Sequence, residues 1–499
     1  MFHKTKKNYN NNSKKDPEII AKEDNFWLWF LWILRVARIV DTEYSVKGSY
    51  VWLDWGYALY NKIYQSAQEA YRSSGHKQMQ FPTLIKEETF LKETEFIRNF
   101  EDDVFWVDRE GHKELSQGER LALRPTSELV IYPMFARWIR SWRDLPLKIF
   151  QNVSIFRCET NETRPLIRNR ETIGFIEGHA ALASKKEALQ HLDLIWQCYT
   201  ALFEKLGLPV KFIEVPDWDR FAGSGKTVDG YVVFPHSKSM ELFTTAYLGT
   251  TFSKIFDINY LDKERKSTLA HLLCYGPSID RILASLIALF GDNRGLVLLP
   301  ELSPIQIAIV PIFRKNNKDT ILHFANRISE KLLNLGFTIE LFDDNLTTPG
   351  MKFYETERLG IPLRIELGSN EIQKNELTVT RRDTLEKSKF SLNDDLLKDN
   401  LSNLLDTVSK DLRVKIQQKY KSQIVDLTTI SIKEYLEKTP LQQDRMYLIN
   451  WCGAQTCAKK LEELSNFSIL GFDLNLKKKQ VKCAICSKKG HISVLAKRY

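Results

Sequence analysis

The stretch from Gln151 to His179 constrains the fold of this chain more than any other. It reads as an apolar strand, a polar loop and a second strand that runs into Glu177-Gly178-His179. Guanidinium groups placed on a strand are rigid and permanently charged, so they suit the joint binding of a polyphosphate and a carboxylate. The alternative is a solvated hairpin with surface arginines. The charged residues concerned are Arg157, Glu159, Arg164, Arg168 and Arg170.

The length of 499 residues exceeds what one hydrophobic core supports and indicates about three domains. A hydrophobic content of 43% and a charged content of 27% are typical of soluble globular proteins. The net charge of +9 is compatible with a nucleic-acid partner, but many proteins without such a partner share it.

Four of the seven cysteines gather near the end of the chain, and the other three are isolated. This is no disulfide framework, and it favours a reduced, intracellular protein. Cys452-x4-Cys457 and Cys483-x2-Cys486 supply two thiolate pairs, enough for a closed tetrahedral zinc site. Such a site has no open position, so the metal would be structural. Unmetallated thiols are the alternative.

The N-terminal region contains two unusual segments. Residues 1–24 are rich in Lys and Asn and are predicted to form a disordered basic tail. Phe26–Val40 is strongly apolar but too short to span a membrane, and Arg35 and Arg38 interrupt it. It also lacks the features of a signal peptide. We therefore expect an amphipathic or buried helix and no membrane attachment.

The sequence Arg124-Pro125-Thr126-Ser127-Glu128 precedes an apolar-periodic segment. Its hydroxyl residues predict a capped helix whose buried face includes Val130, Met134 and Trp138. On this interpretation alone, Thr126 and Glu128 would only form the capped first turn.

Further segments have clear periodicity. Residues 185–206 predict an amphipathic helix, and the apolar residues of 279–290 fall on one helical stripe. Met79–Leu84 predicts a short strand whose Pro82 marks a sheet margin or an interface. From 305 to 380, strands and helices alternate as in a parallel or mixed sheet.

Taken together, the motifs resemble those of prolyl-tRNA synthetases, class II enzymes, in their archaeal/eukaryote-like form. The resemblance covers nearly all of the chain from about Ala37 to Tyr499. The motifs that carry it are the Pro82 strand, RPTSE at 124–128, FRCE at 156–159, EGH at 177–179, FAG at 221–223, Arg281 with GDNRGLVL at 291–298, PGMKF at 349–353, GIPLRIELG at 360–368, RRDTLEK at 381–387, the cysteine pairs and a terminal AKRY.

The resemblance implies an α+β catalytic domain, with an antiparallel sheet flanked by helices, over residues 25–300. It implies an α/β anticodon-binding domain over 301–405 and a small α+β zinc-binding domain over 406–499. It also implies a homodimer formed across the Pro82 region. The spacing between the motifs leaves no room for the large editing insertion of the bacterial form.

The implied activity is that of a proline–tRNA ligase, which activates L-proline with ATP and transfers it to the 3′ end of tRNA(Pro). ATP, L-proline, tRNA(Pro), Mg²⁺ and structural Zn²⁺ are the implied ligands, and the cytoplasm is the implied location. The catalytic residues would be Arg157 and Arg281. Those implied to bind proline are Thr126, Glu128, Arg157, Glu177, His179 and Phe221. Those implied to bind ATP are Arg157, Glu159, Arg168, Asn169, Glu241, Thr244, Ser278 and Arg281.

Several positions depart from the family pattern. Glu241 and Ala246 replace a glutamine and a histidine, and residues 172–176 and 276–281 each carry one extra residue. Phe175 either replaces a tryptophan or stacks on adenine. Tyr499 is expected either beside the active site or in a frayed terminus.

These departures keep open a second hypothesis, a catalytically weakened, synthetase-like tRNA-binding protein. Another class II synthetase is a third. Lys352, Arg364, Arg381 and Arg382 are basic candidates for contacting tRNA, and a solvated face is their alternative.

Overall fold

The structure is a computed structural model that describes residues 20–91, 104–116, 118–159, 162–221, 223–314, 316–392, 396–477 and 479–499. Of the predicted basic tail, residues 1–19 lie outside these ranges. Lys22 is buried, and its ammonium donates a hydrogen bond to Gly291 O at 2.7 Å, so the last residues of that segment belong to the fold.

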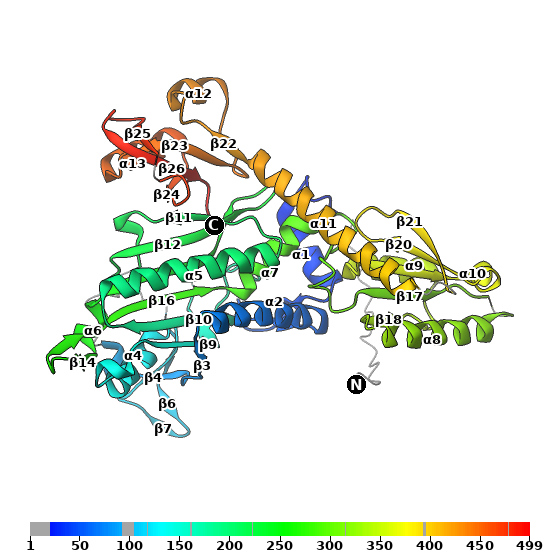
Figure 1. Ribbon diagram of the computed structural model, residues 1–499, viewed down its shortest axis with the longest axis horizontal. Helices are drawn as coiled ribbons and strands as arrows, with labels where there is room; N and C mark the ends of the chain where they lie inside the picture. Colours follow the sequence, from blue (N-terminus) through cyan, green and yellow to red (C-terminus); the bar gives the residue numbers. More distant parts are fainter. Residues whose placement is uncertain are drawn as a thin grey trace.

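A twelve-stranded sheet runs through the catalytic part and the C-terminal part of the chain (Figure 1). Its strands are β3 (Lys77–Gln78), β9 (Leu147–Phe156), β10 (Glu171–Leu182), β11 (Lys211–Glu214), β12 (Lys226–Val233), β13 (Ser239–Gly249), β16 (His271–Pro277), β22 (Ile424–Asp426), β23 (Met446–Trp451), β24 (Ser468–Asp473), β25 (Gln480–Lys482) and β26 (Lys489–Ala496).

The order in this sheet is β22-β23-β26-β24-β11-β12-β13-β16-β10-β9-β3, with β25 beside β26. Described neighbours pair antiparallel, except β22 with β23 and β3 with β9, which are parallel. The predicted hairpin is β9 and β10, and Glu177 lies opposite Gln151 in its register. The register shifts between Thr172 and Phe175, in the segment predicted to carry one extra residue.

Alternate residues of the central strands enter two different hydrophobic cores. Phe150, Leu273 and Tyr275 pack under the helices of one face, whereas Ile149 and Cys274 belong to a cluster on the other. This alternation is what the two-residue period of a strand produces. The first face is covered by α1 (Phe26–Val36), α2 (Asp54–Ser73), α5 (Lys185–Lys205) and α7 (Ile279–Phe290), and the second by α4 (Glu128–Trp138) and α6 (Thr251–Ile255).

Two helix predictions are confirmed. The apolar stripe of α7 is buried, and α1 buries Trp29, Phe30 and Ile33 completely. Among the described residues, no helix has both the length and the apolar character needed to cross a membrane.

The predicted orientation of α4 is wrong. Its buried residues Glu128, Ile131, Tyr132 and Phe135 are spaced i, i+3, i+4 and i+7, whereas Trp138 is 40% exposed. The helix is turned so that Glu128 points inward with the apolar stripe. Its N-cap residue Ser127 makes no capping hydrogen bond with its side chain.

The predicted strand Met79–Leu84 is also wrong, because β3 ends at Gln78 and the next strand begins at Leu84. The buried guanidinium of Arg124 takes the place of a strand partner there. Its Nη1 donates to the carbonyls of Phe81 at 2.9 Å and Pro82 at 2.8 Å.

The other short elements are β1 (Val40–Asp41), β2 (Val51–Trp52), β4 (Leu84–Lys86), α3 (Glu87–Leu91), β5 (Trp106–Val107), β6 (Arg109–Glu110), β7 (Lys113–Glu114), β8 (Leu121–Leu123), β14 (Asn259–Leu261) and β15 (Ser267–Leu269), with 3-10 turns at Trp142–Asp144 and Asp217–Asp219.

The second unit is the predicted α/β fold with a mixed sheet. Its strands follow the order β18-β17-β19-β20-β21; β17 is parallel to β18 and β19, and the other pairs are antiparallel. The elements are β17 (Ile307–Pro311), α8 (Lys318–Asn334), β18 (Ile339–Leu341), α9 (Pro349–Leu359), β19 (Leu363–Leu367), α10 (Ser369–Lys374), β20 (Glu376–Arg381), β21 (Lys387–Ser391) and α11 (Leu397–Gln423).

The C-terminal part adds α12 (Ile432–Lys438) and α13 (Gln455–Ser465) to strands β22 to β26. The predicted boundary between residues 405 and 406 falls inside α11, a long helix that crosses from the second unit to this part (Figure 1). Strand β24 pairs with β11, so the C-terminal strands extend the catalytic sheet.

The junction of β24 and β11 generates a stability prediction. Gly471 has φ +135°, and a Cβ atom there would lie 2.1 Å from Glu214 O. We expect Gly471→Ala to lower the free energy of unfolding by about 3 kcal/mol or more, since backbone strain and a forced strand separation add. Urea unfolding measures the loss.

The matched control is Gly336→Ala, where φ is +97° and no atom lies within 4 Å of the added Cβ. It should cost only the strain of the left-handed backbone, roughly 1–2 kcal/mol. Equal losses in the two variants would contradict the close approach of the strands.

Candidate active site

A cavity of about 340 Å³ opens between the β9–β10 hairpin, β13, β16 and the first turn of α7. It contains every residue that the resemblance assigns to proline or ATP. These residues are Thr126, Glu128, Arg157, Glu159, Arg168, Asn169, Glu177, His179, Phe221, Glu241, Thr244, Ser278 and Arg281. Ala222 of the FAG motif lies outside the described residues.

One end of the cavity carries a buried carboxylate beside apolar and aromatic side chains. Glu128 is 4% exposed, and Thr126 Oγ1 donates a hydrogen bond to its Oε2. Burial raises the pKa of the neighbouring Cys274 thiol well above its usual value, and the Glu128 charge adds to the rise. Phe221 and His179 complete this end, which can hold a small cation with an apolar body.

A second buried carboxylate, Glu177, has several hydrogen-bond partners. Ser127 Oγ donates to Glu177 Oε1, Gln151 Nε2 donates to the same oxygen at 2.9 Å, and His179 Nε2 lies 3.3 Å from Oε2. Burial by itself would raise the pKa of Glu177, but these groups outweigh it, and the net pKa is lowered. The hydroxyl predicted to cap α4 instead holds Glu177 in place.

Arg157 and Arg281 come from segments more than a hundred residues apart and line the same cavity. Burial lowers the pKa of Arg157, and the charge of Arg281 lowers it further. The opposing influences are carboxylates, Glu159, Glu241 and Glu128, which raise it. Two guanidinium groups that line one cavity attract an anionic ligand.

Arg281 is held by main-chain oxygens from two elements. Its Nε donates to Ile167 O at 3.2 Å and its Nη1 to Glu241 O at 3.1 Å. The Glu241 carboxylate lies 3.4 Å from the same nitrogen. The glutamate that departs from the family pattern therefore faces an arginine, which offsets its negative charge.

The loop between β9 and β10 brings three further predicted residues to the cavity. Arg168 Nε and Glu159 Oε2 form an ion pair at 3.1 Å. Asn169 is buried, and its Nδ2 donates to Asp280 Oδ2 at 2.8 Å. Phe175 lines the cavity, and its main chain bridges to Ser278.

Reasoning from the sequence missed Asp280 and Cys274 as cavity residues. Both stand next to residues that were recognised: Asp280 precedes Arg281, and Cys274 pairs with His179 across β10 and β16. The strand period that places His179 in the cavity could have identified its cross-strand neighbour once the pairing was known.

Tyr499 lies beside this site. It lines a second hollow of about 240 Å³ with Arg164 and Lys238, and that hollow shares Arg168, Glu241 and Arg281 with the main cavity. Its hydroxyl contacts Ser237, and the Arg164 guanidinium lies 5.3 Å from its ring centroid. The expected position near the active site is therefore the one observed for this side chain.

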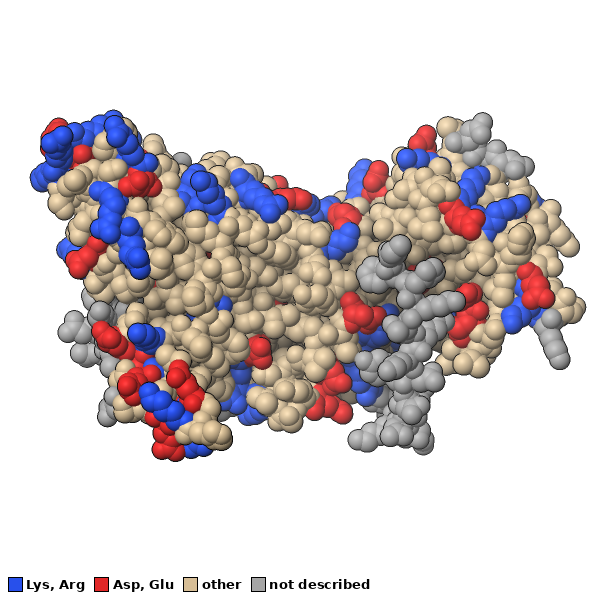
Figure 2. Space-filling view, turned by 90° about the horizontal axis from the view of Figure 1, so that it is seen from below, with Lys and Arg blue, Asp and Glu red and all other residues tan. Residues whose placement is uncertain are grey.

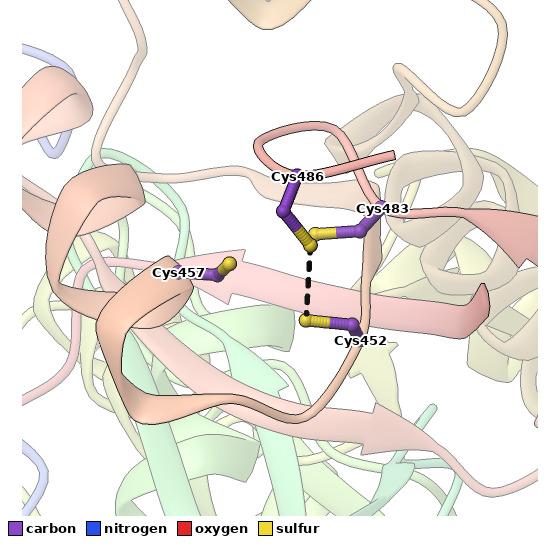
Figure 3. Close-up of side chains that lie close together, drawn as sticks. All are labelled: Cys452, Cys457, Cys483 and Cys486. Carbon is purple, nitrogen blue, oxygen red and sulfur yellow. Dashed lines mark hydrogen bonds between the residues drawn. The ribbon is translucent and has the colours of Figure 1, made fainter. Parts of the chain in front are cut away.

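The four C-terminal cysteines converge (Figure 3), and their sulfur atoms lie within 4.8 Å of one another. Cys452 follows β23, Cys457 lies in the first turn of α13, and Cys483 and Cys486 flank the turn before β26. Cys486 Sγ and Cys452 Sγ are 3.7 Å apart. A soft four-thiolate shell of this size fits a zinc ion.

The basic candidates for tRNA contact do not lie on a solvated face and are not exposed for contact with tRNA. Lys352, Arg364, Arg381 and Arg382 are all buried. Arg364 pairs with Glu357 at 3.0 Å and Glu366 at 3.1 Å, and Arg382 pairs with Asp292. Charged groups are buried in proteins only when paired in this way, so these residues hold the second unit together and join it to the end of α7.

Comparisons with known proteins agree with this arrangement. Residues 105–290 match the family model described as the tRNA synthetase class II core domain (G, H, P, S and T), and residues 306–419 match that of the anticodon binding domain. The prolyl-tRNA synthetase of Giardia lamblia, in complex with prolyl-adenylate, superposes with a TM-score of 0.89 at 31% identity over 96% of this chain and 99% of that one. That of Cryptosporidium parvum, complexed with halofuginone and AMPPNP, gives 0.88 at 28% identity over 96% and 99%.

Fold and cavity thus define a class II aminoacyl-tRNA synthetase. The proline–tRNA ligase of Methanopyrus kandleri is 38% identical over 473 residues, which cover 94% of this chain and 95% of that protein. That of Methanosphaera stadtmanae is 37% identical over 472 residues, covering 94% and 98%. The chain belongs to the proline–tRNA ligase family.

The hydrogen bonds around Glu177 generate a prediction. Ser127→Ala should lower the free energy of unfolding at pH 7 by roughly 1–3 kcal/mol, because a buried carboxylate loses a donor. The folded-state pKa of Glu177 lies below its ordinary 4.5, so the carboxylate's contribution is present above that pH and lost as the pH falls through the folded-state value.

The difference between the variant and the wild type should therefore shrink as the pH falls below 4.5, the ordinary pKa of a glutamate, and through the lower folded-state value. Urea unfolding at several pH values measures it. The exposed Ser422→Ala serves as control and should stay within ~0.5 kcal/mol of wild type. A difference that does not depend on pH would show that Ser127 does not act through the Glu177 carboxylate.

Proposed function

We propose that this protein is an AMP-forming proline–tRNA ligase, which activates L-proline with ATP to prolyl-adenylate and transfers the prolyl group to the 3′ end of tRNA(Pro). One observation carries the proposal: Arg157, Arg281 and Glu128 line a single cavity. Relatives of that name across 94% of the chain support the choice of amino acid. The reaction would take place in the cytoplasm.

Each residue has a physical role in the proposal. Glu128 and Thr126 receive the ring ammonium of proline, while Phe221 and His179 surround the apolar ring. Arg157 binds the amino-acid carboxylate together with the α-phosphate, which orients the attack and offsets the charge that develops there. No side chain needs to act as a nucleophile.

The remaining cavity residues would hold the nucleotide. Arg281 binds the γ-phosphate end of ATP, and the residues beside it are Glu159, Arg168, Asn169, Glu241, Thr244 and Ser278. Magnesium fits this end, because carboxylate oxygens of Glu159 and Glu241 line it. The ion would supply charge neutralisation of the phosphates.

We assign tRNA recognition to the second unit. Its α/β fold and its match to the anticodon binding domain support this. The predicted division into a catalytic domain (25–300), an anticodon-binding domain (301–405) and a zinc-binding domain (406–499) remains our functional proposal.

The alternative is a catalytically weakened protein that still binds tRNA. The ion pair of Glu241 with Arg281 favours it, because a phosphate must compete with that carboxylate for the guanidinium. The retained arginines and Glu128 favour activity.

Proline-dependent exchange of pyrophosphate into ATP distinguishes an active proline–tRNA ligase from a weakened tRNA-binding protein and from a synthetase for another amino acid. Robust exchange with proline supports the ligase. No exchange, with tRNA still bound, supports the weakened protein. Exchange with a different amino acid would contradict the proline assignment.

Within that assay, we expect Arg157→Ala to reduce exchange by about 10²–10³-fold or more, since one pre-positioned charge for the α-phosphate is removed. Circular dichroism should show an intact fold. Arg109→Ala is the control, because Arg109 lies outside the cavity and pairs only at the surface with Glu114 among its described contacts. A wild-type exchange rate in the Arg157→Ala variant would show that this arginine does not stabilise the α-phosphate during activation.

We further propose that Cys452, Cys457, Cys483 and Cys486 bind one structural zinc ion. Cys457 and Cys483 are buried in the hydrophobic cluster formed by β23, α13 and β26. The ion would therefore cross-link these elements and stabilise the C-terminal part. A closed shell of four thiolates leaves no position for a substrate.

Metal analysis of the purified protein should therefore find one zinc per chain. Cys483→Ser should lose the metal and lower Tm by roughly 5 °C or more, because the stabilisation by the ion is lost. Cys198→Ser, an isolated cysteine on α5, should keep both the metal and Tm. Metal-free protein whose Tm does not respond to added zinc would refute the assignment.

Finally, we propose the homodimer across the Pro82 region that the resemblance implies, and we extend its interface to the side of α2. Exposed apolar side chains gather on and just before this helix: Tyr44, Val46, Val51 and Tyr57. Leu84, two residues after Pro82, is exposed as well. The face seen in Figure 2 has a broad centre with few charged side chains, and α2 lies on that side of the molecule. A face with few charges that also exposes apolar side chains is typical of an interface.

Sedimentation velocity should show a dimer for the wild type and a shift to monomer for Tyr57→Glu, because a buried unpaired charge opposes association. Leu333→Glu, at a similarly exposed position on α8, should leave the dimer intact. A monomeric wild type, or a dimer that tolerates the Tyr57 change, would count against this interface.

A further inference from the structure

The segment from Asp217 to Phe221, between β11 and β12, carries Phe221 to the end of the cavity proposed to bind proline. Asp217, Trp218 and Asp219 are exposed, and none of them lines the cavity. The Phe221 ring is half-buried, and its centroid lies 6.4 Å from that of Phe252, near the upper end of the range for aromatic contacts. This packing alone holds Phe221 weakly, so its position depends on what holds the rest of the segment.

The first contact that holds the segment is an ion pair with the end of the chain. Arg498 Nη1 lies 2.6 Å from Asp219 Oδ2, and Nη2 lies 3.4 Å from Oδ1. Two parallel contacts of this kind fix direction as well as distance. The main chain around Arg498 is fixed to the start of β13, because Ser239 N donates to Lys497 O at 2.8 Å and Tyr499 N donates to Ser239 O at 3.2 Å. Asp219 is therefore tied to a rigid backbone.

The second contact joins two tryptophans. The exposed Trp218 ring meets the Trp451 ring edge-to-face, with centroids 5.7 Å apart and an interplanar angle of 80°. Trp451 is completely buried, stacks on Phe472 at 4.9 Å and donates from Nε1 to Ala454 O at 3.1 Å. Trp218 thus rests on a ring that the core of the C-terminal part holds in place.

On its other side, Phe221 is tied to the catalytic sheet. Arg220 Nη1 donates to Gly225 O at 3.1 Å, and Gly225 N donates to Tyr247 O on β13 at 2.8 Å. Phe221 follows Asp219 by two residues, so the chain lets their Cα atoms separate by no more than about 7 Å. A shift of Asp219 therefore moves Phe221.

We propose that Trp218 and Asp219 are positioning residues through which the C-terminal part of the chain holds Phe221 at the proline end of the cavity. This inference rests on the proposed function and deepens it, because it gives the C-terminal part a role in binding the amino acid. Neither residue lines the cavity, so both act through Phe221.

The effect on kinetics follows from the position of Phe221. When its segment is loosened, only a fraction of the molecules presents the complete pocket, and the apparent affinity for proline falls by that fraction. The residues proposed to bind ATP lie on β13, α7 and the β9–β10 hairpin with its loop, away from this segment. The KM for proline should therefore rise, while the KM for ATP and kcat at saturating proline stay the same.

The test measures both KM values by proline-dependent exchange with the full-length protein. Asp219→Asn should raise the KM for proline about two- to fivefold, the range for a partly exposed ion pair. Trp218→Ala should raise it roughly two- to tenfold, since an aromatic contact is lost. Glu69→Gln is the matched control, because Glu69 forms a surface ion pair of the same length, 2.6 Å, with Lys205. It should leave both KM values unchanged.

Charge reversal tests the pair itself. Asp219→Arg places two guanidinium groups together and should raise the KM for proline further than Asp219→Asn does. Adding Arg498→Asp restores opposite charges and should bring the KM for proline back toward the wild-type value. A double variant no better than the Asp219→Arg variant would overturn the role of the pair.

A binding measurement separates this inference from the proposed function. Calorimetry with a sulfamoyl analogue of prolyl-adenylate, which cannot react, should give a Kd that rises in the Trp218 and Asp219 variants by the same factors as the KM for proline. If the wild type exchanges with proline and binds the analogue, but these variants match it or lose affinity for ATP equally, the inference is overturned and the proposed function stands. A wild type that neither exchanges with proline nor binds the analogue would contradict the proposed function, and the inference with it.

Discussion

The placement of two guanidinium groups, those of Arg157 and Arg281, in one cavity is the arrangement on which the site depends. Burial and the second positive charge both disfavour the ionised form of Arg157. The protein keeps the two groups together by fixing one on the β9–β10 hairpin and anchoring the other through carbonyls of Ile167 and Glu241. Carboxylates at the rim offset part of the charge, and a polyphosphate substrate would offset the rest.

The twelve-stranded sheet supplies the rigidity that this arrangement needs. Its central strands send alternate side chains into two cores, so neither face can shift without disturbing the other. The C-terminal strands extend the same sheet through β24 and β11. The cysteine cluster and Tyr499 are therefore connected to the cavity through continuous backbone pairing.

Buried charge also joins the units. Arg382 reaches from the second unit to Asp292 at the end of α7, and Trp55 Nε1 donates to Leu359 O at 3.0 Å. The arginines in the GIPLRIELG and RRDTLEK motifs are thus internal ion-pair partners.

The sequence by itself determined most element types and the spacing of the four cysteines, because periodicity and spacing are local properties of the chain, and the family resemblance implied most of the polar cavity residues. Only the tertiary structure decided which face of α4 is buried, since Ser127 at the start of this helix donates to Glu177 on β10, a residue distant in the sequence. Likewise, Asp280 at the start of α7 meets Asn169 from the loop between β9 and β10, although 111 residues separate them. Contacts across such distances depend on strand pairing, and no local pattern of residues encodes that.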